Sequence, residues 1–267
     1  MARRSPIAAF VAAAVLALTG CAGETLLPGV PVATSDTVST STISTEAPAG
    51  GSAPKAAAFN PFSDGTQTEV GGREVIANPT VEQVMLAGPL PEMALGSPNA
   101  PVTIIKYASL TCPYCRQFQL QTFPELKRTY IDTGKVRFIL REFPIGFQSG
   151  AATVALRCAP PEKYFDLYTK FMAQQNVWVS QEVRLDPIFK VASQVGMTRE
   201  QFDACRQNQS MISGLQWVKE RGRTLGVIGT PNFFVNGRLI KTQLGMKEIR
   251  DLVEPVLAGV PSASIPR

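Results

Sequence analysis

The hydrophobic positions of this chain fall into short runs at the spacing of strands, separated by longer stretches at the spacing of helices. Residues 102–109 and 136–143 are runs rich in β-branched and aromatic side chains, which is typical of buried strands. They start about thirty residues apart, and apolar positions at helical spacing fill the interval. The pattern therefore predicts a βαβ unit whose two strands are parallel.

Helical patterns surround this unit. A short helix is expected from Thr80, with Val81, Val84 and Met85 on one face. The helix inside the unit should extend to about Ile131. It contains Pro124, which has no N–H for the helical ladder, so we expect a kink there.

Residues 146–225 contain no convincing strand, and their apolar side chains recur at helical spacing. Pro187 opens one helical segment that Gly196 closes, and a capping-box pattern at 198–201 opens the next. We predict an inserted subdomain of four or five helices over 147–224. Its aromatic stripe is interpreted as packing rather than as a ligand site.

The last part of the chain predicts a hairpin and a final helix. Asn236-Gly237 is typical of a type I′ turn between two short apolar strands within 229–240. Pro231 begins the first of these strands, and a bond preceding proline is the context in which a cis peptide is accessible. A helix over about 246–257 should cover the sheet.

The first residues have the pattern of an export signal. Arg3 and Arg4 precede an apolar segment from Ile7 to Leu18, which is too short to span a bilayer. The following Leu18-Thr19-Gly20-Cys21 resembles a bacterial lipobox, in which the cysteine is acylated and becomes the new N-terminus. We therefore predict a signal peptide over 1–20 and a lipid on Cys21. An ordinary cleaved signal is the alternative, and a twin-arginine signal has less support.

Residues 21–75 are poor in aromatic and large apolar side chains and rich in Ser, Thr, Ala, Pro and Gly. Such a segment cannot bury enough surface to offset its ordering entropy. We predict a disordered, lipid-anchored linker with a span on the order of 40 Å. An ordinary linker of an exported protein, whose length has no function, is an equal alternative.

Composition narrows the class of protein. The chain has 267 residues, 45% of them hydrophobic, as in an ordinary globular protein. The formal net charge is +5, and without the predicted signal 24 basic and 21 acidic residues remain, which does not favour nucleic-acid binding. With Cys21 lipidated or removed, four of the five cysteines remain, an even number that suits an exported protein.

The candidate chemistry lies in Cys112-Pro113-Tyr114-Cys115, directly after the first strand. At the start of a helix this spacing brings two sulfurs within bonding distance, and free N–H groups there favour a thiolate. Pro113 suits the first helical position because its missing N–H would have no partner. Cys112 is therefore the candidate nucleophile of a redox-active pair.

Two alternatives concern these cysteines. A zinc half-site has the same spacing, but a closed site needs four ligands, and this chain has no histidine and no second close cysteine pair. An inert structural disulfide would not require a strand-to-helix turn. We expect no metal and no cofactor.

Cys158 and Cys205 lie in two predicted helices of the insertion. If they are paired, they close a loop of nearly fifty residues, which the chain-entropy model values at about 4 kcal/mol. Neither has a special turn or a neighbouring cysteine, so a structural link is favoured over a second redox relay.

Taken together, these motifs resemble the DsbA family of exported thiol-disulfide oxidoreductases. The resemblance covers about residues 80–260. It is carried by Cys112 to Cys115, Arg141 to Pro144, the Cys158 and Cys205 pair, and Thr230-Pro231 with residues 233–237. It implies an α/β, thioredoxin-like fold over 76–262, with core segments 98–146 and 225–260 around the all-helical insertion.

The resemblance also implies roles for single residues. Cys112 would form the mixed disulfide and Cys115 would resolve it. Pro231 would be a cis proline facing them, crowding out metal, and Thr230 would offer backbone groups to an extended peptide. Pro113 and Tyr114 would border that peptide.

Two positions depart from the family pattern. Many relatives have His where this chain has Tyr114, and a buried acid where it has Lys106. A neutral Tyr114 cannot stabilise the thiolate electrostatically, whereas Lys106 would do so if it lies near the sulfurs. We expect the pKa of Cys112 to be below the free value of about 8.5. We also expect the protein to be less oxidising than relatives with His.

The predicted function is donation of the Cys112–Cys115 disulfide to exported, cysteine-containing proteins in the periplasm. A DsbB-like membrane protein would restore the disulfide, and Cys21 would anchor the chain in the membrane. The alternative is a reductase or isomerase kept reduced by a DsbD-like donor. A non-catalytic peptide-binding module and a zinc-storage protein are further hypotheses.

Overall fold

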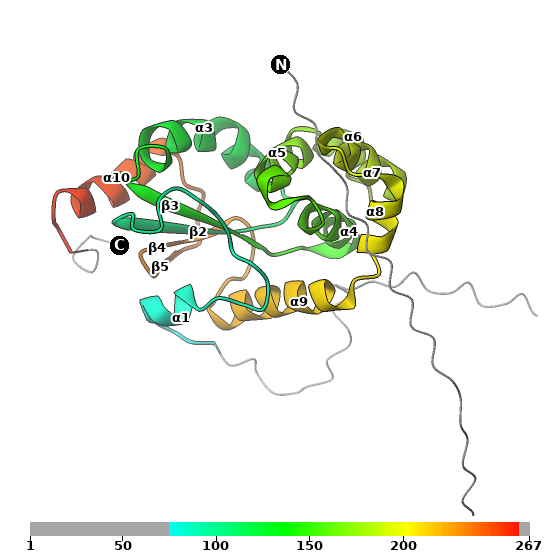
Figure 1. Ribbon diagram of the computed structural model, residues 1–267. Helices are drawn as coiled ribbons and strands as arrows, with labels where there is room; N and C mark the ends of the chain where they lie inside the picture. Colours follow the sequence, from blue (N-terminus) through cyan, green and yellow to red (C-terminus); the bar gives the residue numbers. More distant parts are fainter. Residues whose placement is uncertain (1–74, 262–267) are drawn as a thin grey trace, which may run out of the picture. The chain divides into compact units, whose positions relative to one another are not determined.

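The structure is a computed structural model that describes residues 75–261 (Figure 1). The predicted signal peptide over 1–20, the lipidation site Cys21 and the predicted linker up to residue 74 lie outside the described residues. Those predictions stay predictions. Within 75–261, no helix is both long enough and apolar enough to cross a membrane.

A five-stranded mixed sheet forms the centre, in the order β1-β3-β2-β4-β5. Its strands are β1 (Met93–Leu95), β2 (Val102–Ala108), β3 (Val136–Glu142), β4 (Asn232–Val235) and β5 (Arg238–Ile240). β2 and β3 pair in parallel, with Val102 opposite Val136, whereas β4 pairs antiparallel with β2. The predicted parallel βαβ unit is therefore confirmed.

The predicted hairpin is also present. Asn236 and Gly237 connect β4 to β5 with φ angles of 44° and 83°, the left-handed values that a type I′ turn requires. Strand β1 was missed. It has three residues, too few for a period to be recognised, and pairs antiparallel with β3 at the edge of the sheet.

The helix between β2 and β3 is divided into short segments. α2 (Pro113–Gln117) and α3 (Phe123–Leu126) alternate with π-helical turns at 118–122 and 127–131. Pro124 lies in the first turn of α3, where its missing N–H costs little. A π-helical turn directly precedes it, and the predicted kink itself stays a prediction.

The other helices are α1 (Val81–Met85), α4 (Gly146–Arg157), α5 (Tyr164–Ala173), α6 (Gln175–Trp178), α7 (Leu185–Ala192), α8 (Arg199–Cys205), α9 (Gln209–Thr224) and α10 (Met246–Leu257). Thr198 caps α8 with the predicted capping box, and Gly196 ends the preceding segment in the left-handed conformation. The predicted α1 and α10 are confirmed.

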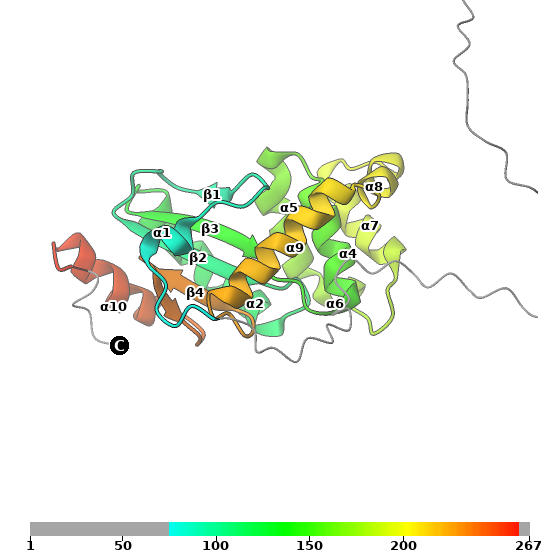
Figure 2. The ribbon, with the colours of Figure 1, turned by 90° about the horizontal axis from the view of Figure 1, so that it is seen from below.

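The prediction for 147–224 needs correction. Six α-helices lie between residues 146 and 224, rather than four or five. Five of them, α4 to α8, gather beside the sheet, whereas α9 runs across one sheet face next to α1 (Figures 1 and 2). α9 packs Val218 against that face, so the separate helical group ends near residue 208.

The two faces of the sheet have separate apolar cores. Ile104, Phe138 and Phe233 point to the face covered by α2, α3, α10 and the helical group. Ile105 and Ile139 point to the face covered by α1 and α9.

The close approach of α9 depends on one glycine. A Cβ on Gly222 would lie 2.7 Å from the ring of Tyr107, so only glycine lets the helix lie this near to β2.

Candidate active site

The first candidate cysteine lies where the predicted strand, turn and helix meet. β2 ends at Ala108, the N–H of Cys112 donates to the Ser109 carbonyl at 3.2 Å, and Cys112 is the N-cap of α2. Its sulfur accepts from the N–H of Cys115 at 3.3 Å, and Pro113 occupies the first turn. The sequence pattern predicted this local geometry.

The two thiols have unequal surroundings. Both are free in this structure, but Cys112 is partly exposed, whereas Cys115 is fully buried. Only the sulfur of Cys112 can therefore meet a macromolecular substrate. The sulfur of Cys115 is confined to reactions with Cys112.

The surroundings also separate the acidities of the two thiols. A hydrogen bond with the Cys115 thiol is the main cause that lowers the pKa of Cys112 to about 6. The Thr230 side chain and the amides of Cys115 and Tyr114 act in the same direction, and partial burial opposes them. Burial raises the pKa of Cys115 well above its ordinary value. Cys112 is thus the thiolate at neutral pH and Cys115 keeps its proton.

The strand β4 brings a proline loop to these sulfurs. The peptide bond between Thr230 and Pro231 is cis, and the Thr230 carbonyl accepts from the Cys112 thiol at 3.1 Å. This contact joins residues 118 positions apart in the sequence. The carbonyl opposes ionisation, because only the thiol form has a proton to donate to it.

An open hollow lies beside this contact, with a volume of about 580 Å³. Its lining combines the active-site loop, the proline loop and the segment after β5: Tyr114, Ile228, Gly229, Thr230, Pro231, Asn232, Lys241, Thr242 and Gln243. Ile228 is 80% exposed and Tyr114 is 58% exposed, so the rim presents apolar surface to solvent.

The structure therefore brings six of the predicted site residues together. They are Cys112, Pro113, Tyr114, Cys115, Thr230 and Pro231. Cys158 and Cys205 lie elsewhere and form a disulfide with 6.0 Å between their Cα atoms. It joins the end of α4 to the end of α8 and packs beside Met211. This is the pairing that the resemblance implies.

The side chain that holds the active-site loop was not predicted from the sequence. Gln175, at the start of α6, donates to the Leu110 carbonyl at 2.7 Å and to the Cys112 carbonyl at 3.1 Å. No pattern in the sequence identifies it, because its partners lie more than sixty positions away.

The motif Arg141-Glu142 divides between the two sheet faces. Glu142 accepts from Arg157 of α4, with 2.9 Å between Oε2 and Nη2, and from the Tyr164 hydroxyl at 2.6 Å. Arg141 points the other way and donates to the Tyr107 hydroxyl at 3.1 Å. Each charge is thus paired within the fold.

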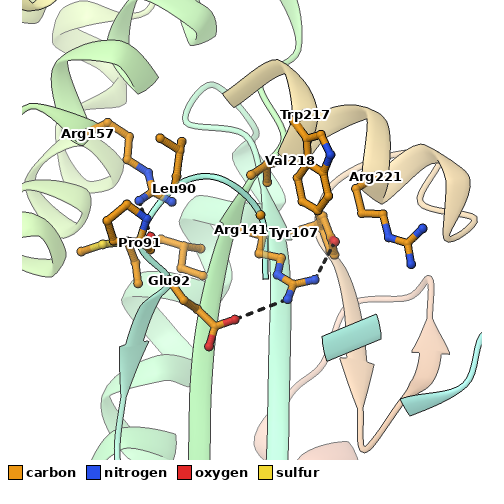
Figure 3. Close-up of a pocket in the computed structure, with 12 residues that line it drawn as sticks. Leu90, Pro91, Glu92, Tyr107, Arg141, Arg157, Trp217, Val218 and Arg221 are labelled. Carbon is orange, nitrogen blue, oxygen red and sulfur yellow. Dashed lines mark hydrogen bonds and ion pairs between the residues drawn. The ribbon is translucent and has the colours of Figure 1, made fainter. Parts of the chain in front are cut away.

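Figure 3 shows a small pocket that Arg141 borders, with its bonds to Glu92 and Tyr107. Its volume is about 20 Å³, room for a single water molecule. It contains no thiol, so we regard it as part of the packing between β3, β1 and α9.

Comparison with known proteins agrees with this geometry. The thioredoxin family model matches residues 90–255. A Rickettsia conorii protein named as a protein-disulfide oxidoreductase is 29% identical over 187 residues, which are 66% of each chain. A Bacillus anthracis protein named as disulfide bond formation protein D is 28% identical over 55% of this chain and 71% of its own length. The matches span 53–66% of the length of the Rickettsia relatives.

A solved structure gives the same result. The crystal structure of Wolbachia pipientis alpha-DsbA1 superimposes with a TM-score of 0.62 at 25% identity, over 68% of this chain and 98% of that one. A thioredoxin fold with a paired-cysteine site facing a proline loop defines the class of thiol-disulfide oxidoreductases. Within that class, the chain belongs to the thioredoxin family as a DsbA-type member.

Proposed function

We propose that this protein exchanges disulfides with exported proteins and that Cys112 forms the mixed disulfide. The observation that carries the proposal is the unequal pair: a partly exposed Cys112 with a pKa of about 6 beside a buried Cys115 that keeps its proton. A low-pKa thiol is both a ready nucleophile and a good leaving group.

The proposed reaction starts from the oxidised pair. A substrate thiolate attacks the Cys112 sulfur, the bond to Cys115 breaks, and Cys115 leaves with the electron pair and takes up a proton. A second substrate thiolate then attacks the substrate sulfur of the mixed disulfide, and Cys112 leaves as a thiolate. The substrate loses two electrons and the protein gains them.

The proposed direction of electron flow rests on the stability of the released Cys112 thiolate. Hydrogen bonds that hold this thiolate favour the dithiol form of the protein, so the disulfide form is the better oxidant. This supports disulfide donation. A reductase or isomerase kept reduced by a DsbD-like donor predicts the reverse flow.

The hollow beside Pro231 suits an extended peptide that carries the substrate cysteine. The apolar rim at Tyr114 and Ile228 would contact its side chains, and the Thr230 backbone would contact its main chain. We infer that the substrates are exported proteins with cysteines, that a DsbB-like membrane protein reoxidises the pair, and that the chain works in the periplasm from a lipid anchor on Cys21.

The redox state of the two cysteines in cells tests this proposal. Cells are quenched in acid, free thiols are alkylated, and the mass of the Cys112-to-Cys115 peptide is measured. A mainly oxidised pair supports the donor, and a mainly reduced pair supports the reductase or isomerase.

Trapping distinguishes an enzyme from a binding module. The variant Cys115→Ser should accumulate mixed disulfides with substrates through Cys112, whereas Cys112→Ser should accumulate none. Full function in cells carrying Cys112→Ala would instead favour a non-catalytic module. Metal analysis of the reduced protein tests the zinc hypothesis; among residues 75–261, no group of three or more Cys, His, Asp or Glu residues could hold a metal ion.

A further inference from the structure

Lys106 is a fully buried lysine in the middle of β2. Its neighbours in register are Leu140 of β3 and Phe233 of β4, both buried and apolar. A lysine at such a position loses nearly all of its hydration, so its charge is costly unless another group compensates it.

The amino group of Lys106 has few partners. Its Nζ donates to the Tyr168 hydroxyl at 3.2 Å and to the Cys115 carbonyl at 3.4 Å, and it lies 4.3 Å from the centre of the Phe118 ring. In the described part of the chain, no ion pair joins Lys106 to a carboxylate. The nearby Glu142 is already bound by Arg157 and Tyr164.

The ionisable groups that face Lys106 come from two helices. α2 contributes Cys112 and Cys115, and α5 contributes Tyr168. Burial raises the pKa of Tyr168 well above its ordinary value, so its hydroxyl stays neutral at physiological pH. The negative charges available to balance Lys106 are therefore the Cys112 thiolate and the thiolate that Cys115 carries when the disulfide opens. Burial lowers the pKa of Lys106 to about 8, and the sulfurs of Cys115 and Cys112 oppose that shift.

We propose that the Lys106 ammonium is the electrostatic partner of the redox pair, stabilising the thiolate that leaves Cys115 when the disulfide opens and favouring the dithiol form. This inference rests on the proposed thiol-disulfide exchange and deepens it. In the disulfide form neither sulfur is charged, and the buried cation has no compensation. In the dithiol form a thiolate compensates it, so Lys106 destabilises the disulfide relative to the dithiol.

The electron and proton balance is that of the exchange itself. Cys115 leaves with the electron pair of the broken S–S bond as a thiolate, which is close to the ammonium because Nζ contacts its backbone. The Cys115 thiolate then takes up one of the two protons that the substrate thiols release, and Cys112 ends as the thiolate. Lys106 is unchanged at the end of the cycle.

The test is the redox equilibrium of the full chain against reduced and oxidised glutathione at pH 7. Lys106→Met keeps the length of the side chain and removes the charge. The equilibrium constant for reduction of the Cys112–Cys115 disulfide should fall about tenfold, or about 30 mV for this two-electron couple. Lys135→Met removes an exposed lysine far along the sheet and should leave the constant unchanged.

Thermal unfolding of the two redox forms distinguishes this electrostatic role from a purely structural one, because a structural role would change both melting temperatures equally. Lys106→Met should raise the melting temperature of the oxidised protein more than that of the reduced protein, because only the oxidised form holds an uncompensated charge. Lys106→Gln, also neutral, should show the same order if Lys106→Met does not fold.

Two failures are distinguishable. An unchanged equilibrium constant, with equal shifts in the melting temperatures of both forms, would show that Lys106 is only structural. A wild-type protein that does not exchange with glutathione at all would instead overturn the proposed function, whatever the variants do.

Discussion

Cys112 and Cys115 are three positions apart in the chain, yet the fold gives them opposite properties. Cys112 caps the start of α2 and is partly exposed, whereas Cys115, in the first turn of α2, is buried. Hydrogen bonds favour the charge on Cys112, and burial disfavours it on Cys115. The order of events in the exchange follows from this difference at the level of single atoms.

The lowered pKa of Cys112 predicts a pH dependence of stability. A thiol that titrates near 6 in the folded protein and near 8.5 in the unfolded chain stabilises the reduced protein above pH 8.5, and this contribution is lost as the pH falls through 6. The oxidised protein has no such thiolate. The melting temperature of the reduced form minus that of the oxidised form should therefore increase from pH 5 to pH 8. Above about pH 8.5 the raised pKa of the buried Cys115 thiol acts in the opposite direction.

Because Cys112 is partly exposed, solvent screening reduces the expected gain to on the order of 1–2 kcal/mol. Thermal unfolding of both redox forms across this pH range measures it. The reduced form of Cys112→Ala is the control and should lose the dependence. A pH-independent difference in the wild type would contradict the assignment.

Tyr114 gives a second prediction for a single residue. Its side chain is mostly exposed and lines the hollow next to Pro231. Tyr114→His would add a partly charged imidazole there, so we expect a lower pKa for Cys112 and a more oxidising protein.

Thiolate absorbance as a function of pH measures the first effect, and equilibrium with glutathione measures the second. Tyr114→Phe, which adds no charge, is the matched control. A Tyr114→His protein that is no more oxidising than the wild type would refute the argument from the residue between the cysteines.

Among the elements, the helical group and the sheet are held together by more than apolar packing. Glu142 at the end of β3 is bound by Arg157 of α4 and Tyr164 of α5, all three largely buried. Gln175 of α6 holds the loop that leads into α2. The helical group thus fixes the position of the active-site loop from the side.

Removing the disulfide between α4 and α8 should lower the stability of the protein without directly changing the chemistry at Cys112. Cys158→Ala combined with Cys205→Ala removes a link across 47 positions. We expect a loss of about 4 kcal/mol in the free energy of unfolding, because the unfolded chain regains its freedom.

Urea unfolding of the double variant and the wild type measures this loss. Exchange with glutathione at Cys112 should persist in the folded double variant. Loss of exchange without loss of stability would instead favour the redox relay.

In the whole molecule, two distant parts of the chain complete the site. The hairpin of β4 and β5 follows the helical group in sequence but pairs with β2, and this pairing brings Thr230 to Cys112. The predicted signal peptide, lipid anchor and linker, from which membrane attachment is predicted, lie before residue 75 and outside the described residues.

The lipobox-like sequence predicts attachment to the membrane through Cys21. Cys21→Ser should move the protein from the membrane fraction to the soluble extract, since acyl chains require the thiol. Immunoblots of the two fractions measure the change, and labelling with a fatty-acid analogue checks the lipid directly. Ser35→Ala, in the predicted linker, is the control and should stay with the membrane. Equal distribution of wild type and Cys21→Ser would indicate an ordinary cleaved signal.

The sequence by itself determined the features that depend on neighbours along the chain. The β-branched runs, the turn at Asn236-Gly237, the capping box at Thr198 and the cysteine pair after a strand follow from local periodicity and dihedral preferences. The three-residue β1, the place of α9 on the sheet and the contacts of Gln175 were not predictable, because each depends on side chains far away in sequence.

Tertiary structure alone decided the charges at the site. The sequence contained a lysine in an apolar run, but only the fold buries Lys106 next to the Cys115 backbone. Only the fold, too, pairs Glu142 with Arg157. The physical reason is that the energy of a charge depends on its distance to other charges and on its access to water, and packing sets both.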